Sequence, residues 1–168
     1  MLYIFGGLPG TGKSTLAQHL ARDEKAVYLR IDTIEQAFRE TVNLVSGEEG
    51  YLIAYRIASD NLLLGLSVVA DSVNPLQVTR AAWREVAMRT GVFFFEIEVV
   101  CSDQAEHRYR VESRSRDIPG FKLPTWDQVV NRPYEPWDAE HIVVDTAGKT
   151  AQQSYATLQQ MLYGKRGG

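Results

Sequence analysis

The ten residues GGLPGTGKST, at 6–15, place four glycines directly before a lysine and two hydroxyl residues. From Gly7 to Ser14 the spacing matches the pattern G-x-x-x-x-G-K-[ST] at every fixed position. A short apolar run, LYIF at 2–5, precedes this stretch, and a segment with leucines four apart, at about 13–22, follows it. The order predicts a buried strand, a glycine-rich loop and an amphipathic helix, which points to an α/β fold.

A loop of this kind, called a P-loop, binds phosphates. Its glycines let backbone N–H groups turn inward around phosphate oxygens, and the following helix adds the partial positive charge of its N-terminus. Lys13 would reach the β- and γ-phosphates, Ser14 would ligate Mg²⁺, and Thr15 can hydrogen-bond an α-phosphate. The predicted nucleotide-binding residues are Gly7, Pro9, Gly10, Thr11, Gly12, Lys13, Ser14 and Thr15. The alternative interpretation is a glycine-rich turn with an exposed lysine.

Beyond this loop, strand-like apolar runs alternate with helix-like segments along the chain. Further strands are expected at 26–31, 67–71, 92–100 and 141–145. Helices are expected at about 33–42, 51–66, from Pro75 to Gly91, 102–115, 126–131 and 150–162, with a break at 46–50 and a loose tail at 164–168. Such alternation predicts a parallel sheet with helices on both faces. Since no repeat, linker or low-complexity block interrupts it, we expect one domain over 1–168.

Composition bounds the partners and the compartment. The 168 residues are 45% hydrophobic with a net charge of −3, so the chain can build a core but lacks the basic excess that attracts nucleic acid or anionic membranes. The lone Cys101 fits a reducing compartment. No apolar run approaches the ~20 residues of a membrane span, and no cleavable leader is recognisable. We therefore expect a soluble, cytoplasmic protein with no membrane partner.

Two acidic residues follow predicted strands on the P-loop side of the sheet. The carboxyl ends of parallel strands share one crevice, so Asp32 and Asp71 should point toward the P-loop. Asp71 ends the run SVVAD like a Walker B acid and is predicted to hold Mg²⁺, the alternative being a turn residue. Asp32 is placed to accept or orient the proton of an acceptor hydroxyl, or to cap the next helix, and both roles can coexist.

Two neighbours of these acids are further candidates for substrate binding. Arg30 would bind an acceptor anion or a phosphate, or pair with an acid. Asn74 would hydrogen-bond substrate or simply form a turn. With Asp32, these two residues make up the predicted acceptor-binding set.

An arginine-rich segment, HRYRVESRSR at 107–116, is the last candidate. Arg110 and Arg114 are four apart, so on a helix they would share one face. The segment then breaks at 117–120, and this pattern looks like a lid over about 108–124 that brings a guanidinium to the γ-phosphate and excludes water.

Two other interpretations of this segment stay open. It can be a solvated helix face with Glu106 and Glu112 as ion-pair partners. It can also be a nucleic-acid patch with Tyr109 and Phe121 as stacking platforms, against which the acidic net charge argues.

Taken together, these residues give a chain that resembles the small P-loop kinases. This branch includes chloramphenicol phosphotransferase, zeta-toxin-like kinases, the kinase domain of polynucleotide kinases, gluconate kinase and adenylylsulfate kinase, and its members are often labelled AAA-family ATPases. The matching pieces are GLPGTGKST, LRIDTIEQAF, VVADSVNPL, EHRYRVESRSRDIPGFKLPTW and YEPW with IVVDTAG. The resemblance implies a five-stranded parallel P-loop NTPase sheet in the order 2-3-1-4-5, ATP as the phosphoryl donor and a mobile helical lid that carries arginines.

The same resemblance assigns roles to single positions. Asp32 matches the aspartate that activates the acceptor, and Arg110 and Arg114 match the R-x-x-x-R pattern of the lid, which makes these three residues catalytic candidates beside Lys13. The loop from Asp145 to Gly148 matches the region that contacts adenine, so these two residues join the predicted nucleotide-binding set.

The leading hypothesis is an ATP-dependent phosphotransferase, with Mg²⁺, that acts on a hydroxyl of a small molecule. A polynucleotide 5′-hydroxyl kinase is the first alternative, and a nucleotide-binding regulatory ATPase without a phosphoryl acceptor is the second. A GTPase would need a guanine-reading N-K-x-D, and the chain has no Asn-Lys pair. Arginines within the chain's own lid favour a kinase over an oligomeric motor. The identity of the acceptor and the oligomeric state stay open.

Overall fold

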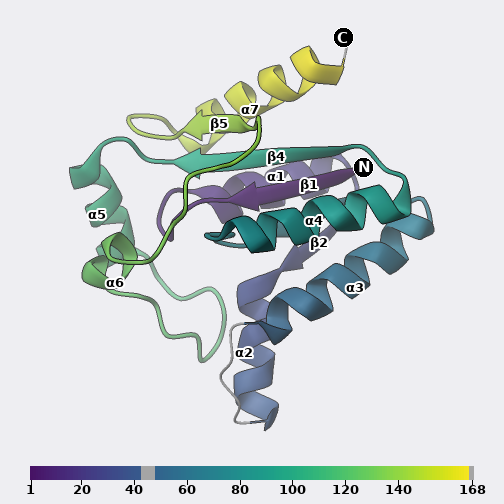
Figure 1. The fold of residues 1–168 in the computed structure, drawn as a ribbon. Coiled ribbons are helices and arrows are strands. Elements are labelled where there is room, and N and C mark those ends of the chain that lie inside the picture. The colour runs from purple at the N-terminus through teal and green to yellow at the C-terminus, as the bar shows by residue number, and fades with distance from the viewer. Residues whose placement is uncertain (43–47, 167–168) are drawn as a thin grey trace.

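The computed structural model describes residues 1–42 and 48–166. Five strands form one parallel sheet in the order β2-β3-β1-β4-β5. They are β1 (Leu2–Gly6), β2 (Val27–Arg30), β3 (Val68–Asp71), β4 (Phe94–Val100) and β5 (Ile142–Asp145). The parallel sheet predicted from the alternation is confirmed, and so is the strand order that the resemblance implied (Figure 1).

Helices cover both faces of the sheet. The helices are α1 (Lys13–Asp23), α2 (Ile31–Val42), α3 (Glu49–Leu63), α4 (Gln77–Thr90), α5 (Gln104–Ser113), α6 (Trp126–Val130) and α7 (Ala151–Arg166), of which α1 and α7 cover one face and α3 and α4 the other. Side chains alternate along β1, so Tyr3 and Phe5 pack with α1 and α7, whereas Leu2 and Ile4 pack with α3 and α4. All four of these side chains are fully buried, which explains the continuous apolar run at the start of the chain.

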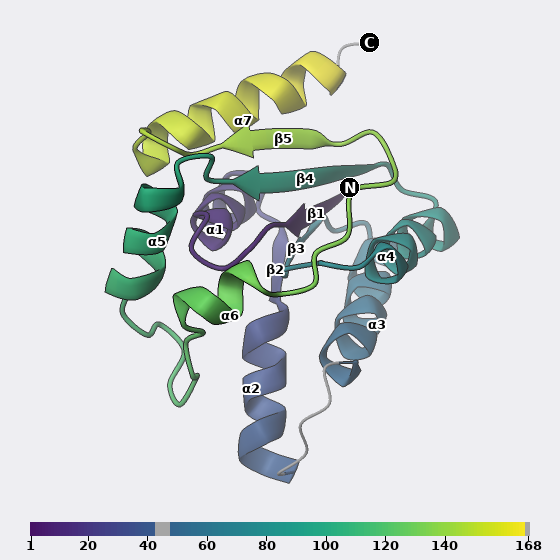
Figure 2. The ribbon, with the colours of Figure 1, turned by 60° about the vertical axis from the view of Figure 1, so that its left-hand side comes forward.

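Three helices lie away from the two covering layers. Figure 2 shows α5 and α6 at the end of the sheet toward which the strand arrowheads point, and α2 projecting from the end of β2. These elements surround the crevice where ligands bind in open α/β sheets. Within the described residues, no helix is both long and apolar enough to cross a membrane.

Several element boundaries differ from those expected. α4 begins at Gln77 rather than at Pro75, because the Pro75 carbonyl accepts hydrogen bonds from Glu135 N–H (2.8 Å) and from Arg80 (3.0 Å) in an extended segment. α5 begins at Gln104 rather than at residue 102, because Asp103 is its N-cap: the Asp103 carboxylate accepts from the N–H groups of residues 105 and 106. α7 continues to Arg166, so most of the expected loose tail is helical, and the last two residues lie outside the described part.

The expected break at 46–50 can be checked only in part. Residues 46 and 47 lie outside the described part, and α3 begins at Glu49, two residues earlier than expected. Gly91 ends α4 with φ of 67°, as a C-terminal glycine should.

Candidate functional site

The P-loop requires glycine at two of its positions. A Cβ at Gly7, where φ is 136°, would collide with the carbonyl oxygen of Val99. A Cβ at Gly10, where φ is 89°, would lie 2.5 Å from Cγ2 of Val111 on α5. The loop is therefore packed between β4 and α5, and its backbone is free of side chains at these two points.

The N-terminus of α1 has no cap from its own chain. Gly12, the N-cap residue, offers no side-chain hydrogen bond, and the first turn holds no acid. The neighbouring helices α5 and α6 are capped by Asp103 and Thr125. Because the first N–H groups of a helix need acceptors, this terminus fits the oxygens of a phosphate.

Lys13 lies over a buried carboxylate. Its Nζ is paired with Oδ1 of Asp71 and lies 3.4 Å from Oγ of Ser14, while the Tyr28 hydroxyl donates to Oδ2 of Asp71 over 2.6 Å. Burial alone would raise the pKa of Asp71, but the Lys13 ammonium and the hydrogen bonds hold it below the usual value. Burial and the Asp71 charge raise the pKa of Tyr28. Asp71 is thus an ionised carboxylate beneath the P-loop.

A cleft of about 1250 Å³ opens in front of this loop. It is bounded by the P-loop, by one face of α2 and by residues between α5 and the end of α6. Predicted site residues that line it are Pro9, Gly10, Gly12, Lys13, Ser14, Thr15, Arg30, Asp32, Arg110 and Arg114. Predicted site residues outside its lining are Gly7, Thr11, Asp71, Asn74, Asp145 and Gly148.

Asp32 lies in the first turn of α2, which begins at Ile31. The expected role as helix N-cap is therefore wrong, because the helix starts one residue before it, directly at the end of β2. Among the described residues, the Asp32 carboxylate has no hydrogen-bond or ion-pair partner. The carboxylate is open to a ligand in the cleft.

Arg30 joins the two sides of the cleft. Its Nη1 lies 2.5 Å from Oδ2 of Asp117, and its Nε lies 4.0 Å from Oδ2 of Asp71. The hydrogen bond from Arg30 holds the pKa of Asp117 below its usual range. Arg30 thus pairs with two acids, one of the alternatives left open by the sequence, and still lines the cleft.

The structure separates the two arginines expected on one helix face. α5 ends at Ser113, and Arg114 has an extended backbone with φ of −68° and ψ of 143°. The prediction that Arg110 and Arg114 share one helix face is therefore wrong. His107 and Val111, which pack against the P-loop, are the buried residues of α5, and the helix ends two residues after Val111.

The environments of the two arginines also differ. Arg110 donates to Oγ1 of Thr146 (2.8 Å), to the Thr146 carbonyl (3.0 Å) and to Glu106 (2.5 Å). Arg114 has two buried nitrogens, Nε and Nη2, without a partner in the described structure. Burial lowers the pKa of Arg114, and the nearby Asp32 charge opposes that effect. Unpaired guanidinium nitrogens at the cleft wall fit an anionic ligand.

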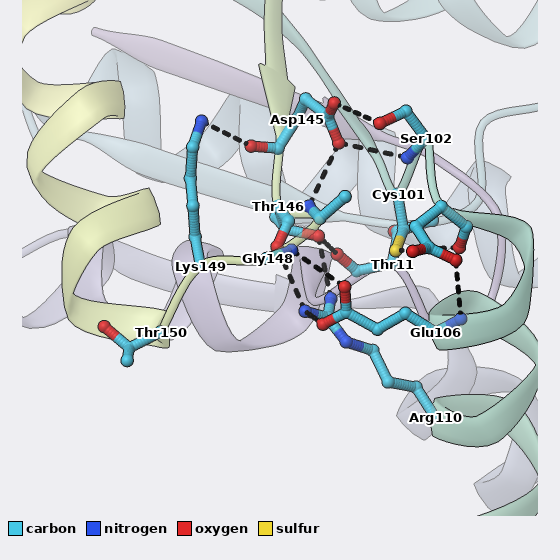
Figure 3. Close-up of polar contacts among 12 residues, drawn as sticks. Thr11, Cys101, Ser102, Glu106, Arg110, Asp145, Thr146, Gly148, Lys149 and Thr150 are labelled. Carbon is cyan, nitrogen blue, oxygen red and sulfur yellow. Dashed lines mark hydrogen bonds and ion pairs between the residues drawn. The ribbon is translucent and has the colours of Figure 1, made fainter.

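The loop after β5 is tied to α5 and to the P-loop (Figure 3). Asp145 accepts from Ser102 N–H (3.0 Å) and from its hydroxyl, and Gly148 N–H donates to Glu106 (2.8 Å). Thr146 donates its hydroxyl to the Thr11 carbonyl over 2.8 Å. Asp145 and Gly148 therefore hold this loop in place beside the P-loop rather than lining the cleft.

Asn74 is fully buried and does not line the cleft. Its φ of 50° fits the turn interpretation, its N–H donates to the Tyr51 hydroxyl (3.1 Å), and its side-chain amide has no partner in the part of the chain described. The fully buried Arg80 donates to the carbonyls of Asn74, Pro75, Glu135 and Pro136 and so fixes this turn. Asn74 thus adjoins the start of the P-loop, since the carbonyl of the preceding Val73 accepts from Gly7 N–H over 3.0 Å, but it does not line the cleft.

Sequence reasoning missed a polar face of α2. Glu35, Gln36 and Arg39 line the cleft with Asp32, at positions i, i+3, i+4 and i+7 of the helix. That spacing was available as a signal. On the opposite side, Lys122 and Arg132 also line the cleft, and no local pattern singled them out.

The chemistry of the donor set fits magnesium rather than a protein-caged metal. No group of three or more His, Cys, Asp or Glu side chains that could hold a metal occurs in the described ranges. Ser14 and Asp71 supply a hydroxyl and a carboxylate close to Lys13, and Mg²⁺ usually takes only one or two such ligands plus phosphate oxygens and water.

Comparisons with known proteins agree with this geometry. A model of the AAA-domain family matches residues 2–132. No curated protein matches the chain.

Solved structures share the fold over nearly the whole chain. Mycobacterium tuberculosis APS kinase CysC, in complex with AMPPNP and APS, is 22% identical over 96% of each chain, with a TM-score of 0.66. A sugar kinase from Janibacter sp. is 15% identical, covering 96% of this chain and 93% of its own, with a TM-score of 0.71. Chaetomium thermophilum Kti12, in complex with ADP-AlF3, is 18% identical over 95% and 98%, with a TM-score of 0.68. The fold is that of P-loop kinases.

Proposed function

The chain belongs to the AAA-domain family, and on that premise we propose that it is an ATP-dependent phosphotransferase that moves the γ-phosphate to a hydroxyl of a small molecule. The observation that carries this proposal is a single cleft with an uncapped helix N-terminus and Lys13 at one end and the unpartnered carboxylate of Asp32 nearby. A nucleotide-binding switch needs the first feature, whereas a phosphotransferase also needs a group that accepts the proton of the acceptor hydroxyl.

The P-loop side of the cleft would bind the nucleotide. The backbone from Gly7 to Thr15 surrounds the phosphates, and Lys13 turns from Asp71 toward the β- and γ-phosphates. Ser14 and Asp71 would hold Mg²⁺, which neutralises phosphate charge when bound. Asp145 and Gly148 would act through their loop, which adjoins the P-loop through Thr146.

The opposite side would bind the acceptor. Its hydroxyl oxygen forms a bond to the γ-phosphorus while the bond from that phosphorus to the bridging oxygen breaks and ADP keeps the electron pair. The hydroxyl proton passes to Asp32, which has no competing partner in the described structure. Arg30 lines the cleft near Asp32 and would contact the acceptor or the transferred phosphoryl group. Asn74 would act only by supporting the turn it occupies.

The two arginines take different roles in this proposal. Arg114, with two unpaired nitrogens, would face the charge that spreads over the phosphoryl group during transfer. Arg110, tied to Thr146 and Glu106, would hold α5 against the nucleotide side. The proposed lid, about 108–124, would then move chiefly from Arg114 onward.

A polynucleotide 5′-hydroxyl kinase is the second candidate. Seven basic side chains and three acidic ones line the cleft, in a chain whose net charge is −3. A basic lining suits a phosphate-bearing acceptor as well as ATP.

The proposed compartment is the cytoplasm, because a chain with the single cysteine Cys101 fits a reducing environment.

The test is a screen of ATP consumption with purified protein and Mg²⁺ over antibiotics, sugars, nucleosides and 5′-hydroxyl oligonucleotides. We expect ADP formation to rise well above background with at least one class, and label from [γ-³²P]ATP to appear in that compound. Uniform low hydrolysis across all classes would contradict a phosphotransferase and favour the regulatory ATPase.

A further inference from the structure

The cleft extends well beyond the P-loop, between α2 and residues 120–132. Its volume of about 1250 Å³ exceeds the roughly 300–1,000 Å³ of a site for one small ligand, so it has room for a second ligand beside a nucleotide. The side chains that line this outer part are Glu35, Gln36, Arg39, Phe121, Lys122, Leu123, Pro124, Gln128 and Arg132. Three of these are basic and one is acidic.

The acids of the cleft do not neutralise this outer part. Asp117 is paired with Arg30, and Oε2 of Glu35 lies 3.2 Å from Nη2 of Arg39. Within the described ranges, Lys122 and Arg132 form no ion pair. Glu35 also attracts Arg132, so one acid faces three basic side chains at the outer end of the cleft, and this end keeps a net positive charge.

Arg39 is held so that it can bind an anion with its planar fork. Glu35, one turn earlier on α2, orients its guanidinium, and the guanidinium carbon lies 5.9 Å from the centre of the Phe121 ring. The side chain is 35% exposed, so it is neither free in solvent nor sealed in the core. An ordered guanidinium loses less entropy when it binds a carboxylate or phosphate in two-pronged geometry.

We propose that the phosphoryl acceptor is itself an anion, whose carboxylate or phosphate group binds Arg39, Lys122 and Arg132 while its hydroxyl lies at Asp32. This inference rests on the proposed phosphotransferase function. Asp32 and Arg39 are seven residues apart on α2, so about 10 Å of helix separates them. The acceptor therefore carries its anionic group several bonds away from the reacting hydroxyl.

Matched pairs of acceptors test the charge requirement. Each pair joins an anionic compound to a close neutral analogue: gluconate with glucitol, glycerate with glycerol, adenosine 3′-phosphate with adenosine, and a 5′-hydroxyl oligonucleotide with its uncharged methylphosphonate analogue. Transfer of label from [γ-³²P]ATP and binding to protein saturated with a non-hydrolysable ATP analogue and Mg²⁺ are both measured. In at least one pair, the anionic member should accept more label and bind more tightly than the neutral member. The oligonucleotide pair shows whether the acceptor is a nucleic acid rather than a small molecule.

Arg39→Gln is the decisive variant. It should raise the KM and the dissociation constant of the anionic acceptor by about tenfold to a hundredfold, leave kcat and ATP affinity near normal, and leave the neutral member unchanged. Arg39→Lys keeps the charge but loses the planar guanidinium, so its KM and dissociation constant for the anionic acceptor should lie between those of the parent and of Arg39→Gln. Arg89→Gln is the matched control, because Arg89 also pairs with an acid four residues earlier but lies on α4, outside the cleft lining.

The outcomes separate the two proposals. If neutral members react and bind as well as their anionic twins, or if Arg39→Gln changes neither constant while its thermal melt matches that of the parent, the anionic acceptor is wrong and the phosphotransferase stands. If neither member of any pair binds the nucleotide-loaded protein, the inference is also overturned. If the protein fails to bind ATP at all, the proposed function itself is wrong.

Discussion

The two sides of the cleft are held together by different kinds of contact. On the P-loop side, His107 of α5 lies 2.9 Å from the Pro9 carbonyl, Val111 packs against Gly10, and Thr146 bonds the Thr11 carbonyl. These groups are buried or half-buried and belong to two elements, α5 and the loop after β5, that interlock around the P-loop. Moving any one of them would leave polar groups unpaired, so this side should stay rigid.

The outer side is joined mainly by side chains near the surface. The Asp117 side chain, which pairs with Arg30, is 56% exposed, and a Cβ at Gly120 would lie 2.7 Å from Nε2 of Gln36. Surface ion pairs contribute at most about 1 kcal/mol. The Arg30–Asp117 pair therefore holds this segment only weakly to β2, although the segment also contains the buried Ile118, whereas α5 is held to the P-loop by buried contacts.

Because of this difference, we expect the predicted lid, about 108–124, to consist of a fixed part before Arg114 and a movable part after it. Residues before it belong to α5 and are anchored by His107 and Arg110, whereas residues after it contact α2 and β2 through Asp117 and Gly120. Arg114 lies at the boundary with two unpaired nitrogens. We expect binding of the acceptor, rather than of ATP alone, to order the segment after Arg114.

Replacing Lys13 should have the largest effect, and this effect should fall on nucleotide binding at the P-loop side of the cleft. Lys13→Met removes the ammonium that reaches the phosphates, so nucleotide binding by calorimetry should weaken severely and turnover should fall to background. It also leaves the buried Asp71 carboxylate with only the more distant Arg30, whose Nε lies 4.0 Å away, and breaking a buried ion pair costs up to about 3–5 kcal/mol.

A double variant separates these two consequences. Lys13→Met with Asp71→Asn has no uncompensated charge, so its melting temperature should recover relative to Lys13→Met. Its activity should not recover. Full activity in the double variant would show that neither residue serves the nucleotide.

Asp32→Asn should have the next largest effect, this time on the outer side. The amide keeps the size of the side chain but cannot take a proton, so kcat should fall by about 10²- to 10⁴-fold. ATP affinity should stay within a factor of two or so, because Asp32 lies beyond the P-loop and pairs with no nucleotide-side residue in the described structure. Persistence of transfer would mean that another group accepts the proton.

Arg114→Gln and Arg110→Gln should separate the boundary from the anchor. Arg114→Gln should lower kcat by about a hundredfold with little change in KM for ATP, as expected for a donor that acts on developing charge. Arg110→Gln removes the bonds to Thr146 and Glu106, so it should mainly raise KM for ATP and lower the melting temperature. Identical kinetic profiles for the two variants would refute the division at Arg114.

The rigid side was largely predictable because its features are local. The glycine spacing, the apolar run before it and the leucines after it are all contained within residues 2–22, and each reports one backbone requirement. The sheet order followed from the resemblance. Thr146 was missed on this side because it gains its role only when β5 brings it beside Thr11.

The outer side was less predictable because its contacts are distant in sequence. Arg30 meets Asp117, and Arg39 meets Phe121, across more than eighty residues each. The four-residue spacing of Arg110 and Arg114 led to the wrong prediction that both lie on α5, because a pattern of charges does not reveal where a helix ends. The polar face of α2 was the one readable signal, and only Asp32 was taken from it.

Breaking the Arg30–Asp117 pair should have the smallest effect, and its pH dependence tests whether the pair joins the two sides. Since Arg30 lowers the pKa of Asp117, the pair stabilises the folded protein above the ordinary aspartate pKa of about 3.9, and that contribution is lost as the pH falls through the lower folded value. Asp117→Asn should therefore lower the free energy of unfolding by less than about 1 kcal/mol near pH 7, with a small drop in melting temperature. The difference in melting temperature between the variant and the parent should shrink toward pH 3. The same variant should speed proteolysis within residues 114–124 without affecting α5. Equal melting at pH 7, or faster cleavage in α5 as well, would mean that the pair does not hold this segment separately and that the two sides open together.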